Sequence, residues 1–172
     1  MLFFSLCPRF LLICENKFYS LRLQNFEQNL QVFTKNNYFF INQFLMSFDP
    51  KKILVLETID STNNYAMALV QKGVATAGNA VFAMDQTQGK GRRGREWQSD
   101  KGENIIISIP VQMQWLPISR QFELSVAVSL AARDLIAKEV SMPTFIKWPN
   151  DIFIGDRKAG GILVENVIKG SS

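Results

Sequence analysis

The chain has 172 residues and a net charge of +4, so it is long enough for one domain with a substantial core and suggests anionic ligands without requiring nucleic acid. It contains no histidine, which excludes histidine general bases, histidine-ligated metals and serine–histidine–aspartate chemistry. The two cysteines, Cys7 and Cys14, have no partner at zinc-ligand spacing and no readable disulfide framework, so we expect a reducing, cytoplasmic setting.

Residues 1–45 differ in composition from the rest of the chain, because they hold 11 of its 20 aromatic residues. Pro8 and Arg9 interrupt an apolar run that is too short to span a membrane, and no signal-peptide cleavage site follows it. The segment also lacks clean helical periodicity. We predict that Met46 is the natural start, that residues 1–45 are a dispensable extension outside the domain, and that the domain covers residues 46–172.

Beyond residue 46 the apolar pattern becomes regular. Lys52–Glu57 predicts a buried first strand, and Asp60–Thr62 caps a helix that runs to about Lys72 and stops at Gly73. The other predicted elements are a strand at 80–84, a central strand at 104–109, a helix at 117–139, a strand at 144–148, and a hairpin of 151–154 with 158–167.

The long helix carries apolar residues at helical spacing, and we predict that all of them face the core: Phe122, Val126, Leu130, Leu135 and Ile136. The order of the elements implies an α+β fold. We expect one mixed, mainly antiparallel sheet with the helices packed against one face.

The segment Asp85–Trp97 stands apart from these elements, because it combines three glycines with four cations: Gly89, Gly91, Gly94, Lys90, Arg92, Arg93 and Arg95. This composition does not suit a packed helix or strand. It suits a loop that wraps an anionic ligand, because glycine allows close approach and guanidinium groups bind phosphate or carboxylate oxygens. A solvated basic loop and an RNA-binding patch are the alternatives. We expect the loop to be mobile without ligand.

Three further blocks accompany this loop in a fixed order: Asp60–Asn63 before it, then Lys147–Asp151 and Arg157–Glu165 after it. With these four blocks, the chain resembles the biotin–protein ligases, also called biotin holocarboxylase synthetases, from about Ile53 to Glu165. The resemblance implies the catalytic fold that these ligases share with lipoate ligases and class II aminoacyl-tRNA synthetases. It also implies activation of biotin with ATP to biotinyl-5′-adenylate, followed by transfer to a lysine of a carrier protein.

The resemblance assigns roles residue by residue, with Arg92 and Lys147 as the catalytic cations. The implied biotin-binding residues are Ser61, Thr62, Asn63, Gln86, Lys90, Gly91, Arg92, Lys147, Gly160 and Gly161. The implied nucleotide-binding residues are Arg92, Arg93, Arg95, Trp97, Lys147 and Asn150, and Asp151 is the candidate metal ligand.

Several of these residues have structural alternatives. Ser61 and Thr62 could serve only as helix caps, and Trp97 as a hydrophobic anchor for the loop. Gly160 and Gly161 could form a β-bulge, and Asn150 with Asp151 a simple turn. Lys147 lies in an apolar strand end, where we expect an anionic partner: either the ligand or, alternatively, Asp151.

The implied ligands are biotin, ATP and Mg²⁺, and the implied partner is a biotin carboxyl carrier protein or the carrier domain of acetyl-CoA carboxylase. We expect no membrane and no nucleic acid, since no helix-turn-helix domain is visible, and a homodimer is left open. The family continues beyond the point where this chain stops, which suggests a fragment or a truncated gene. The alternatives are therefore a biotin- or adenylate-binding remnant without turnover, a lipoate-ligase-like acyltransferase, and a nucleic-acid binder that uses the basic loop.

Overall fold

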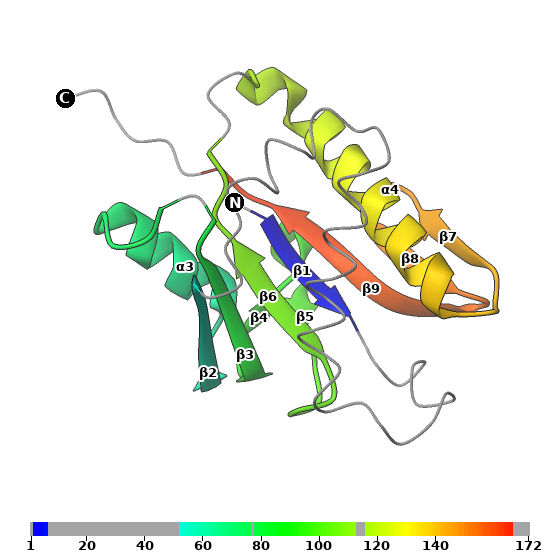
Figure 1. Cartoon of the computed structure of the whole chain (residues 1–172), viewed down its shortest axis with the longest axis horizontal. Helices are drawn as coiled ribbons and strands as arrows, with labels where there is room; N and C mark the ends of the chain where they lie inside the picture. Colours follow the sequence, from blue (N-terminus) through cyan, green and yellow to red (C-terminus); the bar gives the residue numbers. More distant parts are fainter. Residues whose placement is uncertain (1, 7–51, 77, 113–115, 167–172) are drawn as a thin grey trace.

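A computed structural model describes residues 2–6, 52–76, 78–112 and 116–166 (Figure 1). Its main sheet has seven strands in the order β2-β3-β6-β1-β9-β8-β7, and β4 and β5 form a separate pair. The elements are β1 (Leu2–Leu6), β2 (Ile53–Ile59), α3 (Thr62–Gln71), β3 (Ala80–Gln86), β4 (Gly89–Lys90), the 3₁₀ turn η3 (Arg92–Gly94), β5 (Glu96–Trp97), β6 (Ile105–Ile109), the 3₁₀ turn η4 (Ile118–Arg120), α4 (Gln121–Glu139), β7 (Thr144–Lys147), β8 (Asp151–Ile154) and β9 (Arg157–Val164).

The predicted α+β fold with a mixed, mainly antiparallel sheet is confirmed. Strands β2 and β3 pair in parallel, and every other neighbouring pair of described strands is antiparallel. The prediction of a buried first strand was wrong. β2 is the edge of the sheet, with Leu54 40% and Val55 52% exposed. An apolar run identifies a strand but does not reveal whether both of its faces are covered.

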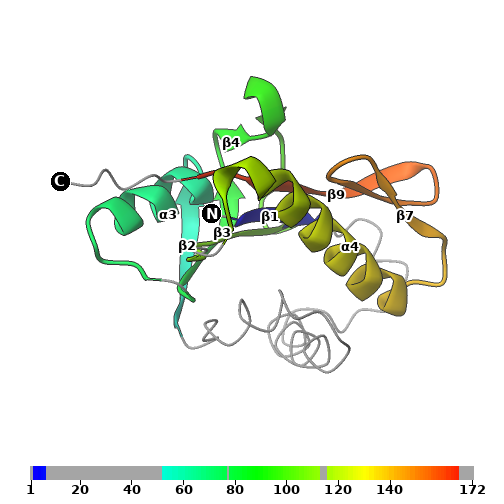
Figure 2. The same ribbon diagram turned by 90° about the horizontal axis from the view of Figure 1, so that it is seen from above.

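The helices lie on opposite faces of the sheet, which corrects the expectation of a single face (Figure 2). Thr62 of α3 accepts a hydrogen bond from Ser108 of β6, so α3 lies on the Ser108 face. The neighbouring Ile107 points to the other face, and the pairing through β1 places Ile162 on that same face. Ile136 of α4 shares a core cluster with Ile162. Sequence order alone does not fix the face on which a helix packs.

Both predicted helices are present near their expected bounds. Ser61 caps α3, and Gly73 follows its end with a φ of +73°. In α4, Ile136 is buried as predicted, but Phe122 and Leu130 are exposed, which corrects their assignment to the core. The apolar residues of α4 cover a broader part of the helix surface than the stripe that packs on the sheet. Some of them therefore face solvent.

Strand β1 lies in the middle of the sheet, between β6 and β9, and is antiparallel to both. Residues 2–6 therefore depart from the expectation that residues 1–45 lie outside the domain. Most of that predicted extension and its boundary at Met46 lie outside the described residues, and the boundary stays a prediction.

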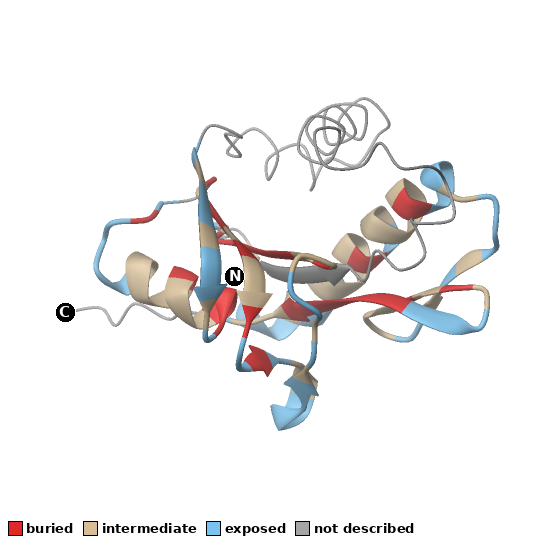
Figure 3. Ribbon diagram, turned by 90° about the horizontal axis from the view of Figure 1, so that it is seen from below, coloured by how far each residue is buried: buried red, intermediate tan, exposed pale blue. Residues whose placement is uncertain are grey.

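Burial concentrates in the central strands (Figure 3). Strand β6 is buried at four of its five positions, which confirms the predicted central strand, and most of β9 is also buried. The β8–β9 hairpin turns at Gly155, which has a φ of +57°. Within the described segments, no helix combines the length and apolar character needed to cross a membrane.

Candidate functional site

The start of α3 is joined to the end of β3 by a buried hydrogen-bond network. The Ser61 side chain accepts a hydrogen bond from the Asn64 backbone N–H and caps the helix. The Gln86 side-chain Oε1 accepts from both the backbone N–H and the hydroxyl of Thr62, at 2.9 and 3.1 Å. The Ser108 hydroxyl donates to Thr62 Oγ1 at 2.9 Å. Ser61 therefore caps α3, and the two hydrogen bonds from Thr62 fix the Gln86 amide in one orientation.

Two polar atoms of this network are buried without a partner among the described residues. They are the side-chain oxygen of Asn63, a residue 1% exposed, and the side-chain nitrogen of Gln86, a residue 5% exposed. The other half of the Asn63 amide is occupied, because its Nδ2 donates to the Glu165 carboxylate after β9. One acceptor and one donor thus remain for a ligand, and burying them unpaired costs about 1–3 kcal/mol each.

The glycine–arginine loop is a short hairpin, which corrects the expectation that it lacks regular structure. β4 and β5 pair across the turn η3, and Gly91 N–H donates to the Arg95 carbonyl at 2.7 Å. A Cβ on Gly89 would lie 2.2 Å from the Trp97 carbonyl oxygen and 2.6 Å from Gln86 Nε2. Gly89 is therefore required for the loop to pass over Gln86, a role that the sequence patterns did not assign.

Two of the four cations of the loop are hydrogen-bonded to other parts of the chain. Arg92 Nη1 donates to Asn150 Oδ1 at 3.0 Å, and Asn150 Nδ2 donates in turn to a β9 carbonyl at 2.9 Å. Lys90 Nζ donates to Asn64 Oδ1 at 2.7 Å, at the first turn of α3. Arg93 and Arg95 are exposed and make no ion pair with the described parts of the chain. Their charges are available to an anion.

Asn64 was not among the predicted site residues, although it connects the loop to α3. Its Nδ2 donates to Asp60 Oδ2 at 3.1 Å while its Oδ1 accepts from Lys90. This side-chain hydrogen bond from Asn64, followed by a backbone hydrogen bond from Ser61, holds the pKa of the Asp60 carboxyl below its usual value. The second Asn of the Asn63-Asn64 pair was the available signal in the sequence.

Trp97 lies between the loop and the β8–β9 hairpin. A Cβ on Gly161 would lie 3.0 Å from the Trp97 ring, and Lys158 Nζ lies 5.0 Å from the ring centroid. The anchoring alternative therefore describes Trp97 in this structure, and the indole ring occupies the space beside Gly161. The β8–β9 register does shift, but the extra residue is Ala159, whereas Gly160 and Gly161 are regularly paired with Ile152 and Asp151.

The prediction that Lys147 needs an anionic partner rested on burial of its side chain, and this premise was wrong. Lys147 is exposed, its Nζ lies 5.5 Å from the Phe153 ring centroid, and no burial cost demands an anionic partner. The alternative internal pair is also wrong, because Asp151 forms its ion pair with Lys158 at 2.8 Å. Lys147, Asp151 and Gly161 are nevertheless directly opposite one another along β7, β8 and β9, so Lys147 projects from the face that carries Trp97 and the loop.

The structure brings most of the predicted residues to one face of the sheet, in two groups, while Gly160 alternates to the other face from Gly161. The Ser61–Asn63 turn and Gln86 come from the β2–β3–β6 side, and Asn150, Lys147 and Gly161 come from the β9–β8–β7 side. The loop spans them through the Arg92–Asn150 contact. No cluster of three or more acidic, cysteine or histidine side chains suited to a metal occurs among the described residues. The result is a group of buried polar side chains, Asn63 and Gln86 among them, next to the cationic loop.

A statistical model of the Biotin/lipoate A/B protein ligase family matches residues 55–172, more than half of the chain. The chain belongs to this family.

Curated relatives agree with this family assignment. It is 36% identical over 123 residues to the bifunctional ligase/repressor BirA of Escherichia coli K12, covering 72% of this chain and 37% of BirA. It is 34% identical over 118 residues to the biotin–[acetyl-CoA-carboxylase] ligase of Mycobacterium tuberculosis, covering 67% of this chain and 44% of that enzyme. The chain thus spans less than half the length of these two relatives.

A solved structure supports the same grouping. Biotin protein ligase from Leishmania major, in complex with biotinyl-5-AMP, superimposes with a TM-score of 0.57 at 30% identity. The match covers 69% of this chain and 53% of that chain. The family match over residues 55–172 includes the candidate site.

Proposed function

We propose that this chain is a biotin–protein ligase domain, which binds biotin and ATP, forms biotinyl-5′-adenylate and transfers biotin to a lysine of a carrier protein. The Mycobacterium tuberculosis relative is named as a biotin–[acetyl-CoA-carboxylase] ligase, and a structural neighbour is a biotin protein ligase in complex with biotinyl-5-AMP. Because the chain spans less than half of the two curated relatives described above, this activity is a proposal for the chain itself.

The observation that carries the proposal is the unpartnered pair of amide atoms on Asn63 and Gln86. The head of biotin is a cyclic urea, which presents one carbonyl acceptor and two N–H donors. The Gln86 amide nitrogen would donate to the urea carbonyl, and the Asn63 amide oxygen would accept from a urea N–H. Both protein atoms would then have hydrogen-bond partners, and no charged group would be buried. The dithiolane ring of lipoate has no such groups and would leave them unpaired.

The chemistry then needs cations at the far end of the biotin chain. In the first step a carboxylate oxygen of biotin attacks the α-phosphorus of ATP, and pyrophosphate leaves. In the second step the lysine ε-amine attacks the acyl carbon, and AMP leaves. The first step brings two anions together, so electrostatic stabilisation is the main requirement. Arg92, held by Asn150, would bind the carboxylate and α-phosphate, while Lys147, Arg93 and Arg95 supply further positive charge.

Mg²⁺ fits this scheme as the ion that arrives bound to the ATP phosphates and neutralises their charge. Asp151 is a single carboxylate already paired with Lys158, and the described residues form no preformed metal cage. Mg²⁺ commonly keeps waters and phosphate oxygens with only one or two protein carboxylates. Asp151 would therefore contribute at most one ligand, after exchanging the Lys158 ammonium for the metal.

The partner in this proposal is the carrier domain of a biotin-dependent carboxylase, as the name of the Mycobacterium tuberculosis relative indicates for that enzyme. We expect the cytoplasm as the location, because ATP and newly made carrier proteins are present there. The absence of nucleic-acid binding stays a prediction, and a homodimer stays open.

Binding calorimetry tests whether the free amide atoms of Asn63 and Gln86 bind the urea ring of biotin. We expect the protein to bind biotin and dethiobiotin, which share the urea ring, and to bind lipoate at least about tenfold more weakly, a difference of about 1.4 kcal/mol. Equal affinity for lipoate would favour the lipoate-ligase-like alternative. Binding of a nucleic acid but neither biotin nor dethiobiotin would favour the basic-loop alternative.

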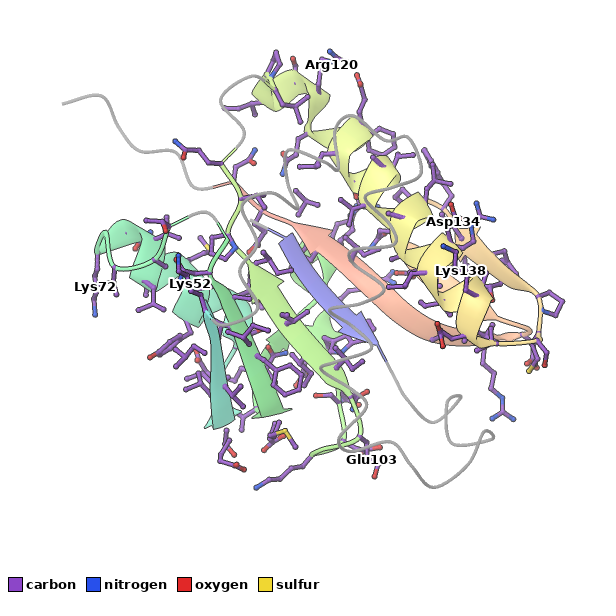
Figure 4. All side chains as sticks on the ribbon, in the orientation of Figure 1. Lys52, Lys72, Glu103, Arg120, Asp134 and Lys138 are labelled. Atoms are coloured by element: carbon purple, nitrogen blue, oxygen red, sulfur yellow. The ribbon has the colours of Figure 1, made fainter. Side chains whose placement is uncertain are left out.

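Turnover separates the ligase from a binding remnant. Biotin-dependent exchange of labelled pyrophosphate into ATP reports the first step alone, and we expect it in the wild-type chain. Biotin binding without exchange would support the remnant. Arg92→Ala should abolish exchange, whereas Arg120→Ala is the matched control, because Arg120 pairs with Glu123 on the outer end of α4 (Figure 4).

A further inference from the structure

Glu165 is a charged residue to which the proposed reaction assigns no role, although it contacts the buried turn of the site. Asn63 Nδ2 donates a hydrogen bond to the Glu165 carboxylate, across 102 positions of sequence. Ile162 and Val164 pack in the core cluster under α4, so the alternation of side chains directs Glu165, just beyond β9, to the face on which α3 lies. Glu165 therefore joins the β9 side of the site to the start of α3.

The chain on either side of Glu165 is held by the first residue of α4. Gln121 Nε2 donates to the Val164 carbonyl at 3.1 Å, and Gln121 Oε1 accepts from Asn166 Nδ2 at 2.9 Å. Both sequence neighbours of Glu165 are thus hydrogen-bonded to the same side chain. The Glu165 carboxylate consequently reaches Asn63 from a fixed position in the fold.

The orientation of the Asn63 amide decides which atom it presents to a ligand. An amide has a carbonyl oxygen on one side and an NH₂ group of nearly the same shape on the other, so a rotation by half a turn exchanges an acceptor for a donor. An ionised carboxylate only accepts hydrogen bonds, and Glu165 can therefore pair only with the Asn63 nitrogen. The free atom of Asn63 is then its oxygen, which is the buried atom without a partner among the described residues.

The Gln86 amide is fixed in the opposite sense by a group that can only donate. The Thr62 backbone N–H donates to Gln86 Oε1 at 2.9 Å, which leaves the Gln86 nitrogen free. A hydroxyl in place of either partner could donate or accept and would impose no orientation. The two buried amides thus present one acceptor and one donor, each set by a group that cannot reverse its hydrogen-bonding role.

We propose that Glu165 is a specificity-determining positioning residue that acts through Asn63. Its negative charge holds the Asn63 amide with the oxygen toward the ligand, so the site selects a head group with an N–H donor at that point. This role rests on the proposed function, because the selected donor would be an N–H of the cyclic urea of biotin. Glu165 affects the ligand only through the Asn63 amide.

Glu165→Gln tests the proposal, because glutamine has the same shape but can donate as well as accept. The matched control is Glu57→Gln. Glu57 is exposed on β2, and its neighbour Leu56 packs against α3, so Glu57 points to the opposite face of the sheet. The probes are dethiobiotin and its two carbamate analogues, in each of which one ring N–H is replaced by oxygen. Calorimetry gives the Kd of each probe for each protein.

For the wild type, we expect the carbamate whose ring oxygen faces Asn63 to bind at least about tenfold more weakly than dethiobiotin, because two acceptors then meet. In Glu165→Gln this ratio should fall at least about threefold, because the Asn63 amide can rotate and donate to the ring oxygen. The control should keep the wild-type ratio. A purely structural role of Glu165 would weaken all three probes equally and leave the ratio unchanged, and that result would overturn the proposal.

Exchange of the acid and the amide gives a second test. Asn63→Asp alone brings two carboxylates together and should lower the midpoint of chemical denaturation. Adding Glu165→Gln restores a contact between one carboxylate and one amide, so the midpoint should recover by at least about half of the loss. The double variant again presents an oxygen to the ligand and should regain the wild-type ratio between the carbamate and dethiobiotin. Failure of the midpoint to recover would overturn the pairing, and failure of the ratio to recover would overturn its role in specificity.

Failure of the proposed function has a different signature. If the wild-type chain binds neither biotin nor dethiobiotin, the proposed function fails, and the selection of a urea N–H fails with it. The recovery of the denaturation midpoint in the double variant then still decides whether Glu165 fixes the Asn63 amide.

Discussion

Replacement of Gln86 separates its structural role from its proposed ligand role. The side-chain oxygen accepts two buried hydrogen bonds from Thr62, whereas the nitrogen has no partner in the described parts of the chain. Gln86→Met removes both functions and leaves two donors of Thr62 unsatisfied. At about 1–3 kcal/mol for each unsatisfied group, offset by partial relaxation, the free energy of unfolding should fall by about 2–4 kcal/mol.

Gln86→Glu has nearly the same shape and keeps both acceptor contacts with Thr62, but it replaces the free N–H donor with an oxygen. Stability should therefore fall less than in Gln86→Met, with some cost for the buried charge. Biotin affinity should fall by about 1–3 kcal/mol, which is roughly 5- to 150-fold, because the urea carbonyl loses its donor.

Chemical denaturation and biotin calorimetry measure these two effects, at about pH 8 so that the new carboxyl group is ionised. If Gln86→Glu binds biotin as tightly as the wild type, the free amide nitrogen does not contact the ligand. If Gln86→Met is as stable as the wild type, the hydrogen bonds between Thr62 and Gln86 do not stabilise the fold.

Three further predictions concern the charged residues. Lys147→Ala should change the free energy of unfolding by less than about 0.5 kcal/mol, because the side chain is exposed, but should slow adenylate formation about 10- to 150-fold in a pyrophosphate-exchange assay. Arg92→Ala should weaken biotinyl-adenylate binding by a similar factor, while Arg120→Ala leaves it unchanged. Asn64→Ala should raise the pKa of Asp60 toward its ordinary value in an NMR titration, and an unchanged pKa would refute the assigned cause. Because the folded-state pKa of Asp60 is depressed, its small stabilising effect is present above the unfolded-state pKa and lost as pH falls through the folded-state value.

The sequence predicted the local features of the site well. The cap at Ser61, the end of α3 before Gly73 and the turn at Gly155 follow from residue types with specific backbone preferences. Gln86 and Asn150 were expected in the site because of the motif resemblance, and the structure places both beneath the loop. These are short-range patterns, in which a few adjacent residues determine the geometry.

The errors concern long-range packing. The alternation Thr144–Lys147 is equally consistent with Lys147 facing a core or solvent, and only the position of β7 at the sheet edge decides that it is exposed. The opposite faces of α3 and α4 depend on the sheet register in the same way. The Leu2–Leu6 segment was assigned to an extension outside the domain because of the composition of residues 1–45, yet it pairs with two strands that are each about a hundred or more residues away.

The roles of Gly89 and Asn64 could not be predicted from the sequence for a different reason. Glycine in the loop was expected to allow close approach, but the specific contact of Gly89 with Gln86 and Trp97 requires the folded hairpin. Asn64 connects Asp60 and Lys90, which are 30 residues apart in sequence. Neither role is visible without the three-dimensional arrangement of the loop over α3.

The most direct test of the proposed ligase activity is mass spectrometry of a purified carrier domain after incubation with this chain, biotin and Mg·ATP. We predict that the carrier gains the mass of one biotinyl group on a single lysine, that the gain requires ATP, and that Arg92→Ala prevents it while Arg120→Ala does not. An unmodified carrier, in a reaction where the chain is folded and a control biotin ligase labels the same carrier, would contradict the proposed activity of this chain.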